Sequence, residues 1–166
     1  MKKIIIVLIL VVYIASIAVV NFFGLETKVF DGITYVNDIQ CNSVTLQRED
    51  PIVIEAGDRL PDGRIPFSFN FIPAPDGTSY TIDDESIVSN PNTVQINYEV
   101  FPHLADERGV TFEFDKEANE GNVVFHEISR TFVFIKPNKG ITITIKANDG
   151  SNIKTQIYIF ASYVEQ

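Results

Sequence analysis

The stretch "VQINYEVFPHLADERGVTFEF", residues 94–114, decides the fold of this chain. Apolar and polar residues alternate on both sides of a short cluster that contains Pro102, His103, Asp106 and Glu107. Period-two alternation in β-branched and aromatic residues is typical of strands that bury one face and expose the other. The stretch therefore predicts two strands, and it raises the question whether the ionisable cluster between them performs chemistry or is only a loop.

The same alternation recurs along most of the chain. It is clear at residues 67–71, 141–147 and 153–160, and shorter apolar runs predict further strands at residues 33–46, 52–54, 80–82, 123–125 and 132–135. Turn-forming residues separate these runs, and Asn148-Asp149-Gly150 predicts a hairpin because Asp-Gly supplies the positive φ that tight turns need. No stretch after residue 25 has helical periodicity, so the sequence predicts an all-β fold, a sandwich or a barrel, and the half-buried strands favour an antiparallel β-sandwich.

The N-terminus differs from the rest of the chain. Residues 4–20 form an apolar run without charge or proline, and the apolar character continues to residue 25. A helix of about 20 apolar residues spans the roughly 30 Å hydrocarbon core of a bilayer. Two lysines precede the run, which predicts a cytoplasmic N-terminus. We therefore expect residues 1–25 to be a single transmembrane anchor that contacts the lipid bilayer through residues 4–25.

A cleaved signal peptide is the alternative for the same segment. Ser16-Ile17-Ala18 fits the small-x-small pattern of a cleavage site, although the sequence stays apolar beyond it as far as Phe23. The anchor and the signal peptide both export the remainder of the chain, whereas a third interpretation is a helix buried within a soluble protein. Residues 30–165 are then expected to form one domain, extracellular or periplasmic, with the anchor interpretation placing the protein in the cell membrane.

The charge of the exported part limits its partners. Of 13 Lys and Arg, two precede the apolar run and 11 follow it, whereas all 22 Asp and Glu follow it, which gives this part a net charge of −11. A field of this sign disfavours nucleic acids and anionic lipid surfaces. We expect no nucleic-acid partner, and an unknown protein or glycan remains as the partner.

Cys41 is the only cysteine, so an intrachain disulfide is impossible and stability must come from the core. Its position within an expected strand predicts a buried small hydrophobic residue. Pairing between two chains is the alternative.

Catalytic chemistry finds little support in the sequence. Only His103 and His126 are available as a general base, one in an expected loop and one at a strand end, and no Gly-x-Ser-x-Gly elbow is present. Two isolated histidines and Cys41 do not form a zinc pattern. We therefore expect no catalytic, cofactor-binding or metal-binding residues, no cofactor and no enzyme.

Calcium binding is an alternative that rests on acidic loops. Asp83-Asp84-Glu85 and the two Pro-Asp-Gly turns, residues 61–63 and 75–77, offer oxygen ligands, but no D-x-D-x-D-G loop is present. Exposed aromatic residues are another possible route to a function. Phe101 interrupts an alternation, whereas Tyr158 and Phe160 point opposite to their apolar neighbours; we expect Tyr158 and Phe160 in the core, with a surface contact patch as the alternative.

Residues 94–160 resemble a bacterial immunoglobulin-like domain of group 2. "INYEVFPHLAD" is similar to strand B of that family and its Pro-x-x-Ala loop, "VTFEF" to the following strand, and "TFVFIKPNKGITITIKANDGSNIKTQIYIF" to the closing strands. "YVNDIQCNSVTL" is similar to the opening strand. Residues 47–92 are longer than the corresponding part of the family, and Phe112 stands where the family often has a core Trp.

This resemblance implies an immunoglobulin-like sandwich that acts as a surface spacer or adhesive module without catalytic residues. Together with the anchor, it predicts a non-enzymatic, membrane-anchored envelope module for binding, spacing or assembly. A secreted β-sandwich that binds carbohydrate or calcium is the alternative. In this interpretation the cluster at residues 102–108 is a loop, in which Pro102 ends a strand and Ala105 turns back onto the core.

Overall fold

The computed structural model describes residues 12–13, 32–75 and 90–163. The chain divides into two compact units, Met1–Ile33 and Thr34–Gln166. Among the described residues, no helix is both long enough and apolar enough to cross a membrane. The predicted anchor, residues 1–25, lies outside the described residues except for Val12 and Tyr13, which are helical.

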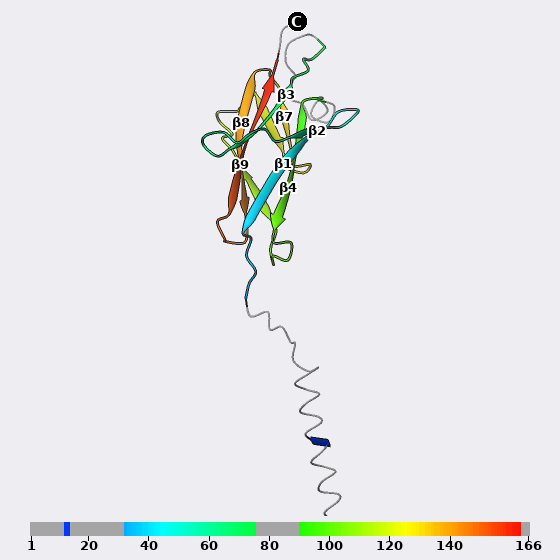
Figure 1. Ribbon diagram of the computed structural model, residues 1–166. Helices are drawn as coiled ribbons and strands as arrows, with labels where there is room; N and C mark the ends of the chain where they lie inside the picture. The colour runs from blue at the N-terminus through cyan, green and yellow to red at the C-terminus, as the bar shows by residue number, and fades with distance from the viewer. Residues whose placement is uncertain (1–11, 14–31, 76–89, 164–166) are drawn as a thin grey trace, which may run out of the picture. The chain divides into compact units, whose positions relative to one another are not determined.

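The second unit is all-β in the part that the structure describes (Figure 1). Its strands are β1 (Asp38–Leu46), β2 (Ile52–Glu55), β3 (Ile65–Asn70), β4 (Thr93–Phe101), β5 (Val110–Glu113), β6 (Val123–His126), β7 (Thr131–Phe134), β8 (Lys139–Ala147) and β9 (Lys154–Ser162). The two strands predicted on either side of the cluster at residues 102–108 are β4 and β5, which confirms that this cluster is a connection between strands.

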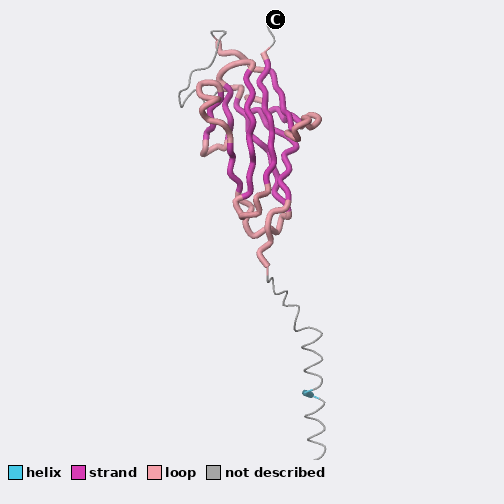
Figure 2. The backbone as a smooth tube through the Cα atoms, turned by 90° about the vertical axis from the view of Figure 1, so that its left-hand side faces the viewer, coloured by secondary structure: helices cyan, strands magenta, loops and turns pink. Residues whose placement is uncertain are grey.

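The strands form two sheets, ordered β2-β1-β4-β7-β6 and β3-β9-β8-β5, with the connecting loops gathered mainly at the two ends (Figure 2). The predicted hairpin at residues 148–150 is confirmed, because β8 and β9 pair antiparallel from Lys139–Ala161 to Lys146–Lys154. The prediction of a wholly antiparallel sandwich is wrong in one place. β3 runs parallel to β9, in a register that pairs Ile65 with Ile157.

Some predicted strand limits also need correction. Residues 33–37 are not part of a strand, and β1 begins only at Asp38. The chain before β1 is instead held by loop side chains, as described below. The strand predicted at residues 80–82 lies outside the described residues.

The core lies between the sheets and consists of the alternating apolar side chains of the long strands. From β8 and β9 the isoleucines at 141, 143, 145, 157 and 159 are all at most 1% exposed. They share one core with Val44 and Leu46 of β1 and Val94 of β4, which are at most 2% exposed. Removing this much apolar surface from water is the main stabilising term of the fold, because no disulfide is available.

One side of the core is a cluster of aromatic rings. The Phe132 ring of β7 is fully buried and lies between those of Phe112, Phe114 and Phe125, with ring centroids 4.6–6.2 Å away. Tyr98 of β4 extends the cluster through an edge contact with Phe112 at 5.8 Å. These rings connect the two sheets. Phe112 belongs to β5 of one sheet, whereas Tyr98, Phe125 and Phe132 belong to β4, β6 and β7 of the other.

Tyr158 and Phe160 are not core residues, so the preferred prediction for them is wrong. They are half-exposed on the outer face of β9, and the Tyr158 ring lies over Gly140 of β8. A Cβ atom at Gly140 would meet the Tyr158 hydroxyl at 2.2 Å. Gly140 therefore leaves room for this ring, and the positive φ in the preceding loop is adopted by Asn138.

Two buried asparagines join the strands at one end of the sandwich. The Asn92 amide accepts a hydrogen bond from the Ile72 N–H at 2.8 Å and donates one to the Ile72 carbonyl at 2.9 Å. Asn90 accepts from the Asn92 N–H at 2.8 Å and donates to the Phe134 carbonyl at 3.4 Å. Buried amides are tolerated only when they are satisfied in this way, and here they connect the chain after β3 with β4 and β7.

Truncating the ring at the centre of the aromatic cluster should weaken the whole sandwich. We expect Phe132→Ala to lower the free energy of unfolding by about 3–5 kcal/mol, because it removes buried contacts and leaves a cavity between the sheets. Urea denaturation followed by near-ultraviolet circular dichroism measures this. Phe160→Ala, which removes a half-exposed ring on the outer face, is the matched control, and equal losses for the two variants would contradict this description of the core.

Candidate functional site

The outer face of β1 and β4 carries a ladder of polar side chains. Cross-strand pairs place Gln40 opposite Glu99, Ser43 opposite Asn97 and Thr45 opposite Gln95. We call this set the amide ladder; it consists of Gln40, Asn42, Ser43, Thr45 and Gln47 from β1 and the residue after it, and Gln95, Asn97 and Glu99 from β4. Amides and hydroxyls dominate the ladder, and its only charged member is Glu99.

Hydrogen bonds fix the part of the ladder that runs from Ser43 to Gln47, together with its partners on β4. The Asn97 amide nitrogen donates to the Ser43 hydroxyl at 3.1 Å and to the Thr45 hydroxyl at 2.9 Å. The Gln47 amide donates to the Gln95 side-chain carbonyl at 2.7 Å. These contacts leave the side-chain carbonyl oxygen of Asn97 as a hydrogen-bond acceptor, next to the part of the ladder that holds Gln40 and Asn42.

A β-bulge interrupts the ladder. The register between β1 and β4 shifts between Gln40 and Ser43, so that Cys41 and Asn42 together stand opposite Tyr98. A bulge bends its strand and changes the direction of the side chains next to it. Cys41 is buried, whereas Asn42 is exposed and Ser43, the next residue, is half-exposed rather than returning to the core. Sequence alternation does not place this extra outward residue, and the only signal for it is the consecutive polar pair Asn42-Ser43.

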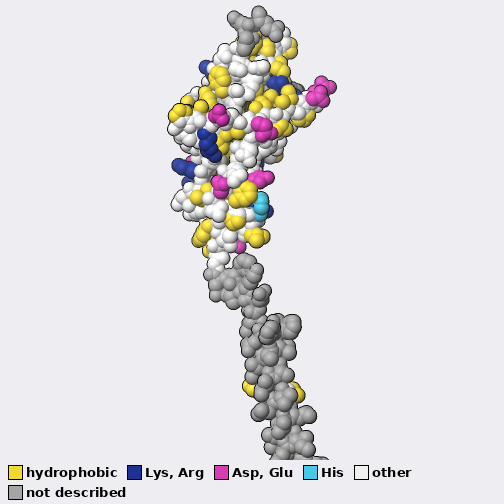
Figure 3. Space-filling view, in the orientation of Figure 1, with side chains coloured by type: hydrophobic (Ala, Val, Ile, Leu, Met, Phe, Trp, Pro, Cys, Tyr) yellow, Lys and Arg dark blue, Asp and Glu magenta, His cyan; other side chains and the backbone are white. Residues whose placement is uncertain are grey.

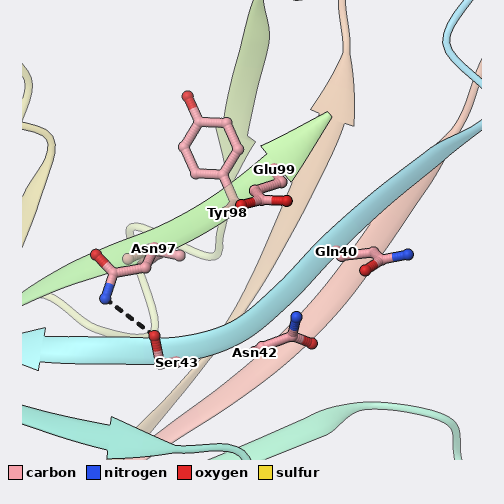
Figure 4. A pocket seen from close by; sticks show the side chains of 7 residues that line it. Gln40, Asn42, Ser43, Asn97, Tyr98 and Glu99 are labelled. Carbon is pink, nitrogen blue, oxygen red and sulfur yellow. Dashed lines mark hydrogen bonds between the residues drawn. The ribbon is translucent and has the colours of Figure 1, made fainter. Parts of the chain in front are cut away.

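The bulge produces an open groove of about 350 Å³, which we call the β1–β4 groove (Figure 4). It is lined by Gln40, Asn42, Ser43, Ile96, Asn97, Tyr98 and Glu99. Figure 4 shows Asn97 turned toward Ser43, while the Tyr98 ring points to the other side of β4. β2 pairs only with residues Ser43 to Leu46 of β1, so that the half of β1 holding Gln40 is a sheet edge and the groove is open there.

The groove is a neutral to acidic, hydrogen-bonding surface. No lysine, arginine or histidine lines it, and its carboxylate, on Glu99, has no salt-bridge partner among the described residues. Gln40 donates its amide to Asp38 at 2.8 Å, which keeps the Gln40 carbonyl oxygen as an acceptor. Asn42 makes no side-chain hydrogen bond to any described residue, so its amide can both donate and accept.

A second hollow of about 260 Å³ lies beside β6. Its floor is apolar and includes Phe114 and Phe125, whereas Lys116, Glu120 and Glu127 contribute charged groups. The Lys116 ammonium lies 5.8 Å from the centre of the Phe114 ring. The hollow is an extension of the aromatic cluster to the surface at the side of the sandwich where β5 and β6 are edge strands.

The cluster that opened the question, residues 102–108, holds the chain that leads into β1. The Asp106 carboxylate accepts a hydrogen bond from the Thr34 N–H at 2.6 Å, and the Asp106 N–H donates to the Thr34 carbonyl at 3.1 Å. Ala105 is buried, as predicted. His103 is exposed, and its ring lies 4.6 Å from that of Phe101 without a hydrogen bond to any described residue. Asp106 therefore has a structural role.

Asp149, in the turn between β8 and β9, holds the same leading segment. Its carboxylate accepts hydrogen bonds from the backbone N–H groups of Ser151, at 2.9 Å, and of Val36. Hydrogen bonding by the Ser151 side chain foremost, and then by the backbone N–H groups of Val36 and Ser151, holds the pKa of Asp149 below its usual range. Two aspartates from different turns thus replace the strand that the sequence predicted at residues 33–36.

His126 does contact a hydroxyl, which the sequence alone did not show. Its Nδ1 atom lies 2.7 Å from the Ser129 Oγ atom, and Ser129 in turn lies 2.7 Å from the Thr131 hydroxyl. No carboxylate of the described residues hydrogen-bonds His126, and His103 belongs to a different loop. The contact between Ser129 and His126 spans only three residues, which is typical of a local loop turn. Because His103 lies in another loop, the two histidines do not form one site.

No group of three or more His, Cys, Asp or Glu side chains suited to a metal ion occurs in the described ranges. Of the acidic positions considered for calcium, Asp62 is engaged by Arg64, with a nitrogen–oxygen distance of 2.7 Å. Asp76, Asp83, Asp84 and Glu85 lie outside the described residues.

Cys41 is the buried small residue that the sequence predicted, at 1% exposure. Burial raises the pKa of its thiol to about 12, since a thiolate would lose its hydration in the core. A cysteine in this environment is inert toward disulfide exchange because the thiolate is the reacting species.

Comparison with known proteins yields no match, whether to a family model, to a curated protein or to a solved structure. The resemblance to bacterial immunoglobulin-like domains therefore stays a prediction, and function has to be inferred from the residues described above.

The two roles assigned within residues 102–108 are separable by substitution. We expect Asp106→Ala to accelerate hydrogen exchange at the Thr34 amide, because that N–H loses its acceptor. His103→Ala should leave both the exchange and the stability unchanged within about 0.5 kcal/mol, as for most exposed positions. Hydrogen exchange measured by NMR on both variants tests this. Unchanged protection of Thr34 in Asp106→Ala would show that the carboxylate does not hold this segment.

The raised pKa of Cys41 predicts a specific pH dependence of stability. Below about pH 9 the thiol is neutral in both states, and its contribution is fully present. Above that value the unfolded thiol ionises while the folded one does not until about pH 12, so stability is lost as pH rises. We expect the ratio of the folding equilibrium constant of the wild type to that of Cys41→Ala to fall by up to about tenfold for each pH unit in this range. Denaturant titrations of both proteins at about pH 8 and about pH 10 measure it, and a constant difference would contradict the burial of the thiol.

Proposed function

We propose that this chain is a membrane-anchored, non-enzymatic module of the bacterial cell envelope. An immunoglobulin-like domain outside the cytoplasm binds, spaces or assembles other envelope components. The observation that carries the proposal is the order of two features in a short chain: an apolar run at residues 4–25 behind two lysines, and one acidic β-domain after it.

The strand order supports an immunoglobulin-like fold. Domains of that class place strands A, B, E and D in one sheet and C, F and G in the other. The orders β1-β4-β7-β6 and β9-β8-β5 correspond to this arrangement when β1 is strand A, β4 is strand B, and β5 to β9 are strands C to G. The pair β2 and β3 is then an insertion between strands A and B, in agreement with the extra length of residues 47–92 noted in the sequence.

The surface of the domain supports a binding or spacing role. Acidic and basic side chains are scattered over the face seen in Figure 3, among uncharged surface. The described residues bring no histidine, cysteine and carboxylates together, and their histidines contact only an aromatic ring or a local hydroxyl. The β1–β4 groove is therefore a better candidate for recognition than for reaction chemistry.

A secreted β-sandwich is the second candidate, because the triplet at residues 16–18 fits a cleavage site. Its ligand would be a carbohydrate or calcium.

Fractionation of cells that express the full chain with a C-terminal epitope distinguishes the two candidates. We expect intact protein in the membrane pellet, resistant to carbonate washing, with the epitope accessible to protease added outside the cytoplasmic membrane. The double variant Ile9→Arg/Val12→Arg should lose carbonate resistance, because each arginine at the centre of a spanning helix costs about 2.5–3.5 kcal/mol. Ile9→Leu/Val12→Leu is the matched control. Released protein with an N-terminus at Val19 would overturn the anchored proposal.

A further inference from the structure

We propose that the β1–β4 groove binds a neutral glycan. This inference rests on the proposed binding role of the domain and names the class of ligand. The volume of the groove, about 350 Å³, lies at the lower end of the roughly 300–1,000 Å³ that small-molecule sites occupy. Its open end beside Gln40 allows a chain longer than the groove to continue past the sheet edge.

The hydrogen-bonding groups of the groove match those of a sugar. A sugar hydroxyl both donates and accepts, so it needs a partner surface that offers both functions at close spacing. Asn42 presents a side-chain amide that can both donate and accept. Gln40 and Asn97 present their side-chain carbonyl oxygens, because the amide nitrogen of each already donates to a neighbouring residue. The acceptors are therefore fixed in direction before a ligand binds, which lowers the ordering cost of binding.

Glu99 is the strongest acceptor in the groove. It stands opposite Gln40 across the two strands, and no cation of the described residues neutralises it. A carboxylate has two oxygens and accepts charge-assisted hydrogen bonds, which are about twice as strong as neutral ones. Two adjacent sugar hydroxyls can donate to these two oxygens, so Glu99 is expected to contribute most to affinity.

The charge and the composition of the lining disfavour other ligand classes at this position. An anionic ligand would meet Glu99, with Asp38 beside Gln40, and would find no basic side chain in the lining. A divalent cation usually gathers several carboxylates, whereas Glu99 is the one carboxylate in the lining, and the described residues hold no group of three or more His, Cys, Asp or Glu suited to a metal ion. An apolar peptide segment would have to bury the amides and Glu99 without satisfying them.

The other surfaces with aromatic rings are less suitable for a sugar. The Tyr158 ring lies against Gly140, and the Arg64 guanidinium lies over it, 4.9 Å from its centre. The hollow beside β6 has an apolar floor with charged groups around it, and that combination suits an apolar side chain of a protein partner better than hydroxyl groups.

The test uses the full chain reconstituted in nanodiscs. Biolayer interferometry measures binding to immobilised cellohexaose, chitohexaose and maltohexaose, with polygalacturonate as the anionic comparison and empty nanodiscs as the blank. We expect at least one neutral oligosaccharide to bind, weak dependence on salt, and weaker binding of the anionic polymer. Glu99→Gln should raise the Kd by about tenfold or more, as expected for loss of a hydrogen bond to a charged group.

Matched variants on the other sheet separate the groove from a general effect of mutation. Gln40→Ala is expected to raise the Kd several-fold, whereas Gln156→Ala, which also removes an exposed glutamine with one side-chain hydrogen bond, should not change it. Glu113→Gln is the corresponding control for Glu99→Gln. As a second measurement, the NMR chemical shifts of the Asn42 side-chain amide should change on titration with the oligosaccharide that binds.

Three results would overturn the inference: no binding of any neutral oligosaccharide, preferred binding of polygalacturonate, or equal effects of the groove and control variants. Failure of the inference is distinguishable from failure of the proposed function. A carbonate-resistant protein that binds no glycan refutes only the ligand, whereas a released protein that binds glycan through Glu99 refutes only the anchor.

Discussion

The contact between alternating side chains of the two sheets is the interaction on which the whole domain depends. The isoleucines of β8 and β9 are at most 1% exposed, and they belong to one hydrophobic core with the inward residues of β1, β4 and β7. With a single free cysteine in the chain, no covalent link between strands compensates for a loss of this contact. Since each inward position is fixed by period-two alternation, a register shift of one residue would move an entire apolar row to the surface. The outer faces are free to vary within this constraint.

Alternation therefore explains which parts of the structure were predictable from sequence. Both strands around residues 102–108, the hairpin after β8 and the burial of Cys41 and Ala105 follow from local pattern and turn chemistry, and the structure confirms them. The segment 33–36 was not predictable, because its partners Asp106 and Asp149 are distant in sequence. Tyr158 and Phe160 were misplaced because an outer face can carry aromatic rings where a glycine, here Gly140, leaves room. The groove depends on a bulge, which alternation alone does not reveal.

Polar side chains determine the ends of the sandwich, where the apolar core cannot. At one end, Asn92 imitates a strand by pairing both backbone groups of Ile72. At the other end, Asp106 and Asp149 hold the backbone N–H groups of Thr34 and Val36. In both places a side chain substitutes for a missing neighbouring strand, which satisfies backbone groups that would otherwise lack a partner. Within the ionisable cluster of the opening stretch, Asp106 thus holds the segment that leads into β1.

The parallel pairing of β3 with β9 has a consequence for the order in which the domain forms. β3 has no other strand beside it in its sheet, and its partner is separated from it by the whole of β4 to β8. Contacts between such distant segments close large loops and form slowly. While the chain is being made, residues 65–70 cannot pair with residues 154–162 until those residues have been synthesised. The sheet containing β9 is therefore completed last, and the assembly of the domain is governed by the arrival of its C-terminal strand.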